Sequence, residues 1–215
     1  MREDGRAGEY RPVAGYRAFY PRALPPEPGV VRDGEMDDLH FKATLALGKL
    51  DGAAETLPNP DLFVFMYVRK EAVLSSQIEG TQASLIDVVE FEAGRSRPGG
   101  ARDVAEVVNY VRAMNHGLAR LSALPVSLRL IKEIHRELLE GVRGHERSPG
   151  EFRRVQNWIG PPGCTLADAV FVPPPPQDVE QLLGGLERFI HAAEPMPALL
   201  KVGMVHAQFE TIHPF

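Results

Sequence analysis

The sequence predicts an all-α fold that carries one small β-hairpin. Three observations lead to this prediction. Apolar residues recur at intervals of three and four over most of the chain, which is the spacing of one face of an α-helix. Glycines and prolines separate these periodic stretches, as expected at helix ends. Only the neighbourhood of residues 152–172 favours strands, so a sheet of three or more strands is not expected.

The helical pattern is found in six segments, which are 36–56, 61–76, 101–121, 127–140, 178–192 and 197–212. The segment 101–121 has one apolar face, formed by Val104, Val107, Val108, Val111, Met114, Leu118 and Leu121. In the last segment the residues predicted to face inward are Ala198, Val202, Val205, Phe209 and Ile212. These faces predict buried helices that pack together.

The first part of the chain has a different composition. Residues 1–35 are rich in Pro, Gly and Arg and predict an irregular N-terminal arm. The predicted domains are therefore this arm, an N-terminal helical region over 36–98, and a second domain over 99–215.

The predicted hairpin lies between two helices of the second domain. Its β-leaning segments are Phe152 to Ile159 and Ala169 to Val172, and they flank Gly160-Pro161-Pro162-Gly163. The run Pro173 to Pro176 follows and is interpreted as a stiff connector to the next helix. The alternative is a polyproline II ligand for an SH3 or WW domain.

Composition limits the class of protein. A chain of 215 residues with 44% hydrophobic residues can bury a full core as one domain, or a core with an N-terminal extension. The net charge of -5 argues against nonspecific nucleic-acid binding. The single cysteine, Cys164, has no internal disulfide partner, which favours a reducing cytoplasm. No apolar run approaches the ~20 residues that span a bilayer, so we expect a soluble cytoplasmic protein.

Three short motifs lie in order along the chain and carry the functional prediction. The first is Ser75-Ser76-Gln77-Ile78-Glu79-Gly80, at the end of a predicted helix. The second begins with Pro149-Gly150-Glu151-Phe152-Arg153 and continues through Gln156, Asn157, Trp158, Ile159, Gly160, Phe171, Val172 and Pro173. The third is His213-Pro214-Phe215, directly after the last predicted helix.

Together these motifs resemble the Fic family, whose signature is His-Pro-Phe-x-Asp/Glu-Gly-Asn-Gly-Arg-x-x-Arg. The resemblance covers about residues 60–215 and implies a Fic-like helical bundle in which the hairpin is the flap. It implies protein AMPylation, the transfer of AMP from ATP to a Ser, Thr or Tyr hydroxyl with Mg²⁺ as cofactor. His213 would be the catalytic general base. On this resemblance, a sheet of three or more strands would count against the family assignment.

The resemblance also implies roles for the other two motifs. Ser75, Glu79 and Gly80 match the inhibitory pattern, in which the Glu pairs with the last Arg of the signature and blocks the γ-phosphate of ATP. The flap residues named above would pair with a segment of the target protein. The Mg²⁺ ligand and the phosphate-binding residues follow Phe215 in the signature and are not in this sequence, so no metal ligand is expected here. The chain as given is expected to be inactive.

Several alternatives remain open at this point. A Fic-like protein could transfer another phosphate-containing group, or the chain could be a protein-binding module without catalytic activity. His206, Glu210 and His213 share one helical face and are an alternative metal site. Glu79 could be a surface carboxylate at a helix end. The sequence leaves open the target protein and the formation of a homo-oligomer.

Overall fold

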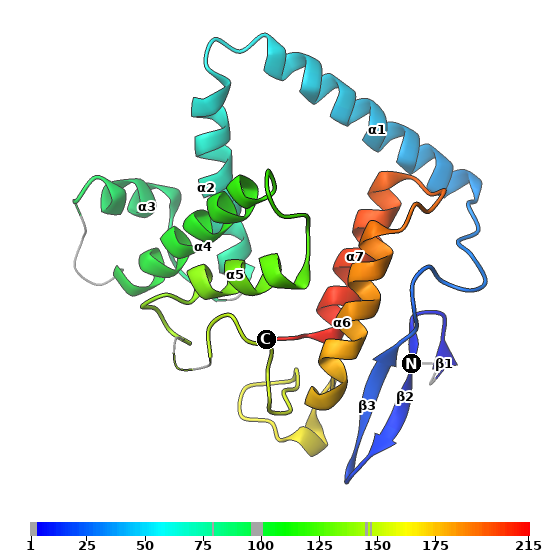
Figure 1. The fold of residues 1–215 in the computed structure, drawn as a ribbon. Coiled ribbons are helices and arrows are strands. Elements are labelled where there is room, and N and C mark those ends of the chain that lie inside the picture. Colours follow the sequence, from blue (N-terminus) through cyan, green and yellow to red (C-terminus); the bar gives the residue numbers. More distant parts are fainter. Residues whose placement is uncertain (1–3, 79, 96–100, 145, 147) are drawn as a thin grey trace. The chain divides into compact units, whose positions relative to one another are not determined.

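The structure is a computed structural model that describes residues 4–78, 80–95, 101–144, 146 and 148–215. Figure 1 shows the order of its helices and strands. The chain forms two compact units. The terminal unit contains both chain ends and comprises residues 1–32, 126–128 and 152–215; the central unit comprises 33–125 and 129–151. Among the described residues, no helix is both long and apolar enough to cross a membrane.

The central unit is helical. Its elements are α1 (Gly34–Glu55), α2 (Pro60–Ile78), α3 (Leu85–Glu92), α4 (Ala101–Arg120) and, from Arg129 on, α5 (Leu128–Leu138). The six helices expected from the sequence are all present, with ends that differ by at most two residues. The additional helix α3 has Ser84 as its N-cap residue. The Ser84 hydroxyl accepts a hydrogen bond from the Asp87 N–H, and the Asp87 carboxylate accepts one from the Ser84 N–H. This capping box stabilises a helix too short to show a periodic pattern.

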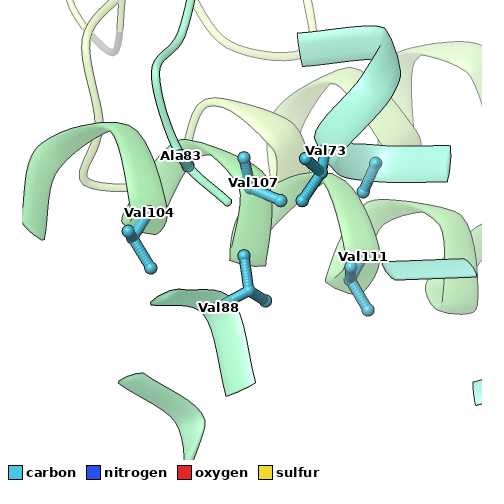
Figure 2. Packing of buried hydrophobic residues seen from close by; sticks show 7 residues of the cluster. Val73, Ala83, Val88, Val104, Val107 and Val111 are labelled. Atoms are coloured by element: carbon cyan, nitrogen blue, oxygen red, sulfur yellow. The ribbon is translucent and has the colours of Figure 1, made fainter. Parts of the chain in front are cut away.

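The core of the central unit lies where α2, α3 and α4 meet. Figure 2 shows its side chains, which are Ala72, Val73, Ala83, Val88, Val104, Val107 and Val111. Each buried valine contributes roughly 1.5–3 kcal/mol through removal of apolar surface from water.

The prediction that the apolar face of α4 continues to its end is wrong. Leu118 and Leu121 are 57% and 45% exposed. In its second half α4 buries small residues instead, and a Cβ atom added to Gly117 would lie 2.8 Å from Cδ1 of Ile134 in α5. Because α5 approaches α4 so closely at Gly117, the buried face there differs from the apolar stripe in the sequence.

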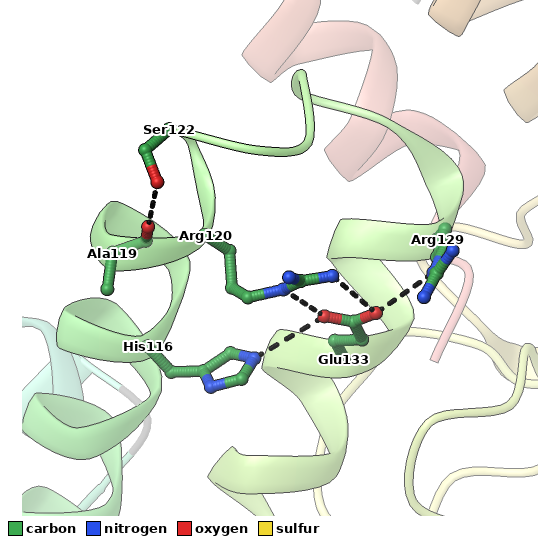
Figure 3. Close-up of polar contacts among 6 residues, drawn as sticks. All are labelled: His116, Ala119, Arg120, Ser122, Arg129 and Glu133. Atoms are coloured by element: carbon green, nitrogen blue, oxygen red, sulfur yellow. Dashed lines mark hydrogen bonds and ion pairs between the residues drawn. The ribbon is translucent and has the colours of Figure 1, made fainter.

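Glu133 in α5 and Asn109 in α4 make polar contacts between the two helices. Glu133 accepts hydrogen bonds from Arg120 and Arg129, and His116 lies 3.5 Å from its carboxylate (Figure 3). The hydrogen bond from Arg120 is the largest cause that lowers the pKa of Glu133 to about 2. The side chain of the buried Asn109 in α4 donates to the carbonyls of Leu138 and Glu140. These carbonyls lie at the end of α5, where the last carbonyls have no partner within the helix.

His135 gives the central unit a pH dependence. Its Nδ1 accepts a hydrogen bond from the Gly150 N–H at 3.0 Å, and burial lowers its pKa to about 4. Unfolding restores a pKa near 6.5, so the unfolded chain binds the extra proton between pH 6.5 and 4. Stability is therefore fully present above pH 6.5, and we expect it to fall by up to about 3 kcal/mol as the pH drops to 4.

Urea unfolding of the wild type and of His135→Asn at pH 7 and pH 5 tests this prediction. The asparagine amide oxygen can accept the same hydrogen bond without titrating. The difference in unfolding free energy between the two pH values should be smaller in the variant. Equal differences in both proteins would show that His135 does not titrate on unfolding.

The terminal unit combines two helices with a sheet. Its elements are β1 (Asp4–Gly5), β2 (Gly8–Val13), β3 (Tyr16–Pro21), a 3-10 turn (Leu166–Asp168), α6 (Pro176–His191) and α7 (Ala198–Ile212). α6 packs on α7, and their core contains Val179, Leu183, Leu186 and Ile212 with Val205 and Phe209 against it. Val202, which was predicted to face inward, is 65% exposed, and Ala198 is exposed as well. The buried face of α7 is thus confined to its second half.

The prediction of an irregular N-terminal arm over residues 1–35 is wrong for residues 4–21. The three strands form an antiparallel sheet in the order β1-β2-β3, with Tyr10 opposite Phe19 and Val13 opposite Tyr16. The rings of Tyr10 and Phe19 meet edge to face at 5.2 Å, a favourable cross-strand pair. Pro12 and Pro21 lie within the two longer strands and hide the strand pattern in the sequence, because proline usually marks a loop.

Candidate active site

His213 lies at the end of α7 in an unusual backbone conformation. It is the C-cap residue, with φ 50° and ψ 65° in the left-handed region, and its N–H donates to the Phe209 carbonyl at 3.0 Å. A residue with a Cβ atom pays roughly 1–2 kcal/mol for this conformation. Pro214 further restricts the residue before it. Other contacts must therefore hold His213 in place.

Arg153 supplies the strongest of these contacts. Its Nε donates to the His213 carbonyl at 2.7 Å, and one terminal nitrogen donates to the carbonyls of Ile212 at 3.2 Å and Pro174 at 2.5 Å. The backbone N–H of Arg153 donates to the Pro214 carbonyl at 2.8 Å. Burial lowers the pKa of this guanidinium to about 10, so it stays charged at neutral pH. A cation at a helix C-terminus also interacts favourably with the helix dipole.

Asn157 and the rings of Phe152 and Phe209 also contact the chain after α7. The side-chain amide of Asn157 donates to the carbonyls of His213 at 3.4 Å and Phe215 at 3.0 Å. The Phe215 ring lies 5.5 Å from that of Phe152 and 6.4 Å from that of Phe209. His213-Pro214-Phe215 is thus packed against the beginning of the second motif.

The segment predicted as a hairpin is mostly irregular. Its only regular pairing among the described residues is one antiparallel bridge between Ile159 and Phe171, in which the N–H of Ile159 donates to Phe171 and its carbonyl accepts from Val170 and Phe171. The Trp158 indole donates to the Cys164 carbonyl, and a Cβ atom on Gly160 would lie 2.5 Å from the Cys164 sulfur. The many prolines and glycines between the two segments explain why no longer ladder forms.

One backbone edge of this segment has no strand beside it among the residues that the structure describes. Because both backbone groups of Ile159 face Phe171, those of Trp158 and Gly160 point to the opposite edge. They make no hydrogen bond in the part of the chain that the structure describes. Ile159 is 47% exposed beside them. This edge can accept an extended peptide.

The N-terminal sheet holds the other side of the segment. The Phe19 N–H of β3 donates to the Val172 carbonyl at 2.8 Å, and the Phe19 and Phe171 rings lie 5.8 Å apart. Tyr16 donates its hydroxyl to the Gln156 amide oxygen at 2.9 Å, and the Gln156 amide nitrogen reaches the Pro173 carbonyl. The end of the segment, Phe171 to Pro173, is therefore held by β3 and by Gln156.

Two neighbouring features support this arrangement. Tyr20 donates its hydroxyl to Asp178 at 2.7 Å, and burial followed by this hydrogen bond raises the pKa of Tyr20 to about 12. Pro173, Pro174 and Pro175 are fully buried, and α6 begins at Pro176. An SH3 or WW domain binds an exposed proline run, and these three prolines are inaccessible. The run is therefore a connector to α6 and not a ligand for such a domain.

The first motif lies in the central unit, at the end of α2. Ser75 donates its hydroxyl to Glu71 one turn earlier in the helix, at 2.8 Å. Gly80 has φ 95°, with its N–H bonded to Gln77 and the next N–H, of Thr81, bonded to Ser76. These are the two hydrogen bonds of a Schellman helix end, which requires a left-handed residue and so favours glycine. Glu79 lies outside the described residues.

The alternative metal site on α7 finds no support in the structure. Among the described residues, no group of three His, Cys, Asp or Glu side chains is close enough to hold a metal ion. His206, Glu210 and His213 share a helical face without forming such a group.

Sequence reasoning missed two parts of this site. The second motif contains Arg153 but does not indicate its contacts, and the composition predicts an irregular arm where β3 lies. One signal was available in the sequence. Arg153 directly follows Pro-Gly-Glu-Phe, and the segment after it has no acidic residue nearby, which favours a guanidinium that donates to carbonyls.

Comparison with known proteins identifies relatives of both parts of the chain. A family model described as Fic/DOC family N-terminal matches residues 38–119, and one described as Fic/DOC family matches residues 125–215. A crystal structure of a Fic family protein from Desulfovibrio desulfuricans G20 has a similar fold, with a TM-score of 0.68 and 21% identity over 86% of this chain. The match covers 54% of that protein, so this chain spans about half of its length.

These matches confirm the predicted fold class and correct one criterion. The fold is mostly helical, as the sequence predicted. The expectation that a sheet of three or more strands would count against the family resemblance is wrong. The sheet occupies residues 4–21, which precede both matched ranges, so it adds to the matched domains without replacing any of their helices.

Proposed function

Since this chain belongs to the Fic/DOC family, we propose that it serves protein AMPylation, the transfer of AMP from ATP to a Ser, Thr or Tyr hydroxyl of a target protein. The observation that carries the proposal is the geometry around His213. Its backbone is fixed at the end of α7, and the same segment that fixes it leads into an open strand edge. A base and a peptide-docking edge built on one segment suit a reaction on a protein side chain.

In the proposed reaction His213 accepts the proton of the acceptor hydroxyl. The hydroxyl oxygen attacks the α-phosphorus of ATP, a new P–O bond forms, and the bond between the α-phosphorus and the bridging oxygen breaks. Pyrophosphate leaves, and the hydroxyl carries AMP as a phosphodiester. His213 is half-buried, and histidine is the side chain that most often acts as a general base.

The target is proposed to dock on the flap by strand addition. An extended target segment would pair with the backbone groups of Trp158 and Gly160. The residues that would form or support this surface are Gln156, Asn157, Trp158, Ile159, Gly160, Phe171, Val172 and Pro173. Because the N-terminal sheet holds the return strand at Val172, the flap would meet the target already ordered.

Mg²⁺ would assist the reaction by neutralising phosphate charge. The described residues bring together no set of ligands for it. The family's acidic ligand belongs to the part of the signature that follows the His-Pro-Phe residues, so we assign no Mg²⁺ ligand to this chain and derive no step through the ion. We place the activity in the cytoplasm, with ATP and a protein as partners.

The first motif is proposed to be autoinhibitory. Glu79 would pair with the last Arg of the signature and keep the γ-phosphate of ATP from its productive position. Gly80 fits the glycine of this pattern, because it has a left-handed conformation after the end of α2 at Ile78. Ser75 would brace the last turns of α2 through Glu71.

Glu79→Gly is expected to increase AMP transfer, because the variant lacks the carboxylate that competes with the γ-phosphate. The protein to test is the extended chain, meaning residues 1–215 continued through the remaining signature residues and the helix that they open. Incorporation of AMP labelled on its phosphate is measured on the chain itself and on added proteins.

The matched control is Glu55→Gly, which removes an exposed glutamate from the end of another helix, α1. The control should leave incorporation unchanged. If Glu79→Gly gives no more labelled protein than the control, Glu79 is only a helix-end residue and the proposed autoinhibition is wrong.

A further inference from the structure

We propose that Arg153 is a positioning residue that holds His213 in its left-handed conformation and thereby directs the imidazole. The proposal rests on the proposed role of His213 as the base. Within the described part of the chain, the Arg153 side chain donates its hydrogen bonds to backbone carbonyls and to no side chain. Its effect on the reaction would therefore pass through the backbone of His213.

The first argument comes from the partners of the guanidinium. An arginine whose guanidinium is partly removed from water is normally paired with a carboxylate, since desolvation of an unpaired charge is costly. Arg153 has carbonyl partners instead, and two of them belong to Ile212 and His213 at the end of α7. A half-buried charge that binds these carbonyls indicates that this helix end has to be fixed.

The second argument comes from what the guanidinium connects. The terminal nitrogen that donates to the Ile212 carbonyl also donates to the carbonyl of Pro174, which directly follows the flap residues. Arg153 thus ties the end of α7 to both ends of the flap segment, since it begins that segment itself. Its planar fork can make these bonds together, whereas a lysine ammonium is a single point of donation.

The third argument is the conformation itself. Without added contacts, a histidine before proline does not favour φ 50°. Asn157 contributes a longer hydrogen bond of 3.4 Å to the same carbonyl. The 2.7 Å bond from a charged donor is the stronger of the two, so the loss of Arg153 should release His213 more than the loss of Asn157.

NMR spectroscopy of the 215-residue chain tests the proposal without any activity. The variants are Arg153→Lys, Asn157→Ala and the matched control Arg154→Lys, which changes the exposed neighbouring arginine. In Arg153→Lys the His213 amide should exchange with solvent at least about tenfold faster, as expected when a charged hydrogen bond is lost. The coupling between its amide and α protons should also leave the left-handed value. The Leu183 amide in the buried interior of α6 should exchange as in the wild type.

Three results would overturn the proposal. His213 exchange and coupling that match the wild type would show that Arg153 does not hold this residue. Equal acceleration at His213 and Leu183 would show a general loss of stability, and an equal effect of Arg154→Lys would show a nonspecific change. If Arg153→Lys does not fold, Arg153→Gln takes its place, because a glutamine amide is a neutral donor to carbonyls and the same three results would overturn the proposal.

Enzyme kinetics then separate this proposal from the proposed function. In the extended chain, Arg153→Lys should lower kcat for AMP transfer and leave KM for ATP unchanged, because the guanidinium donates to backbone carbonyls of this chain and would act through His213. A raised KM with unchanged kcat would contradict the positioning role. An extended chain with no transferase activity at all would contradict the proposed function, while the NMR result would still decide whether Arg153 fixes His213.

Discussion

His213→Ala is expected to lower the rate of AMP transfer by the extended chain about 10²- to 10⁴-fold, the usual contribution of a general base. The acceptor hydroxyl would have to lose its proton to water, and attack on the α-phosphorus would be slow. Single-turnover measurement of labelled AMP on the target gives the rate of the chemical step. The affinity for ATP should change little, because the imidazole is proposed to act on the hydroxyl.

His206→Ala is the matched control for this substitution. His206 is exposed on the same helix, α7, and the structure gives it no contact with the flap. Its replacement should leave the rate unchanged. If His213→Ala and His206→Ala have the same rate as the wild type, His213 is a helix-cap residue and the base lies elsewhere.

Glu92→Ala is expected to destabilise the central unit by about 3–5 kcal/mol, the cost of leaving a buried charge without its partner. Arg69 is 7% exposed, and its guanidinium makes two hydrogen bonds to Glu92, of 2.7 and 2.8 Å. The Phe65 ring lies 3.2 Å from the same guanidinium. Without Glu92 the Arg69 charge stays buried, and its partners among the described residues are the Phe65 carbonyl and ring.

Urea unfolding measures this loss against Asp38→Ala, which breaks an exposed ion pair with Lys42 on α1. Exposed pairs of this kind contribute at most about 0.5 kcal/mol. The midpoint of Glu92→Ala should shift much further than that of the control. Similar shifts in both variants would mean that the Arg69–Glu92 pair contributes no more than a surface contact.

The sequence predicted the parts of this fold that depend on long apolar periodicity. The end of α7 is an example: Val205, Phe209 and Ile212 recur at intervals of three and four, and His213 follows them directly. The periodicity gave wrong predictions of burial where burial depends on which other helix lies beside a residue. Val202 is apolar and exposed, and Gly117 is buried because another helix approaches it, and neither fact can be read from one helix alone.

The site was only partly predictable for a related reason. Motif residues such as His213 and Trp158 could be named, but the contact between Arg153 and His213 joins residues 60 positions apart. The sheet at residues 4–21 was hidden by prolines in its strands, although its residue Phe19 holds the flap at Val172. Contacts between distant segments depend on the folded chain, whereas local periodicity does not.

The nature of the transferred group is the most direct test of the proposed function. The extended chain carrying Glu79→Gly is incubated with Mg²⁺ and with ATP labelled either on the α-phosphate or on the γ-phosphate, and the label on protein is measured. AMP transfer predicts label from the α-phosphate alone, because pyrophosphate carries the γ-phosphate away. Label on protein from the γ-phosphate would show phosphoryl transfer and would contradict AMPylation.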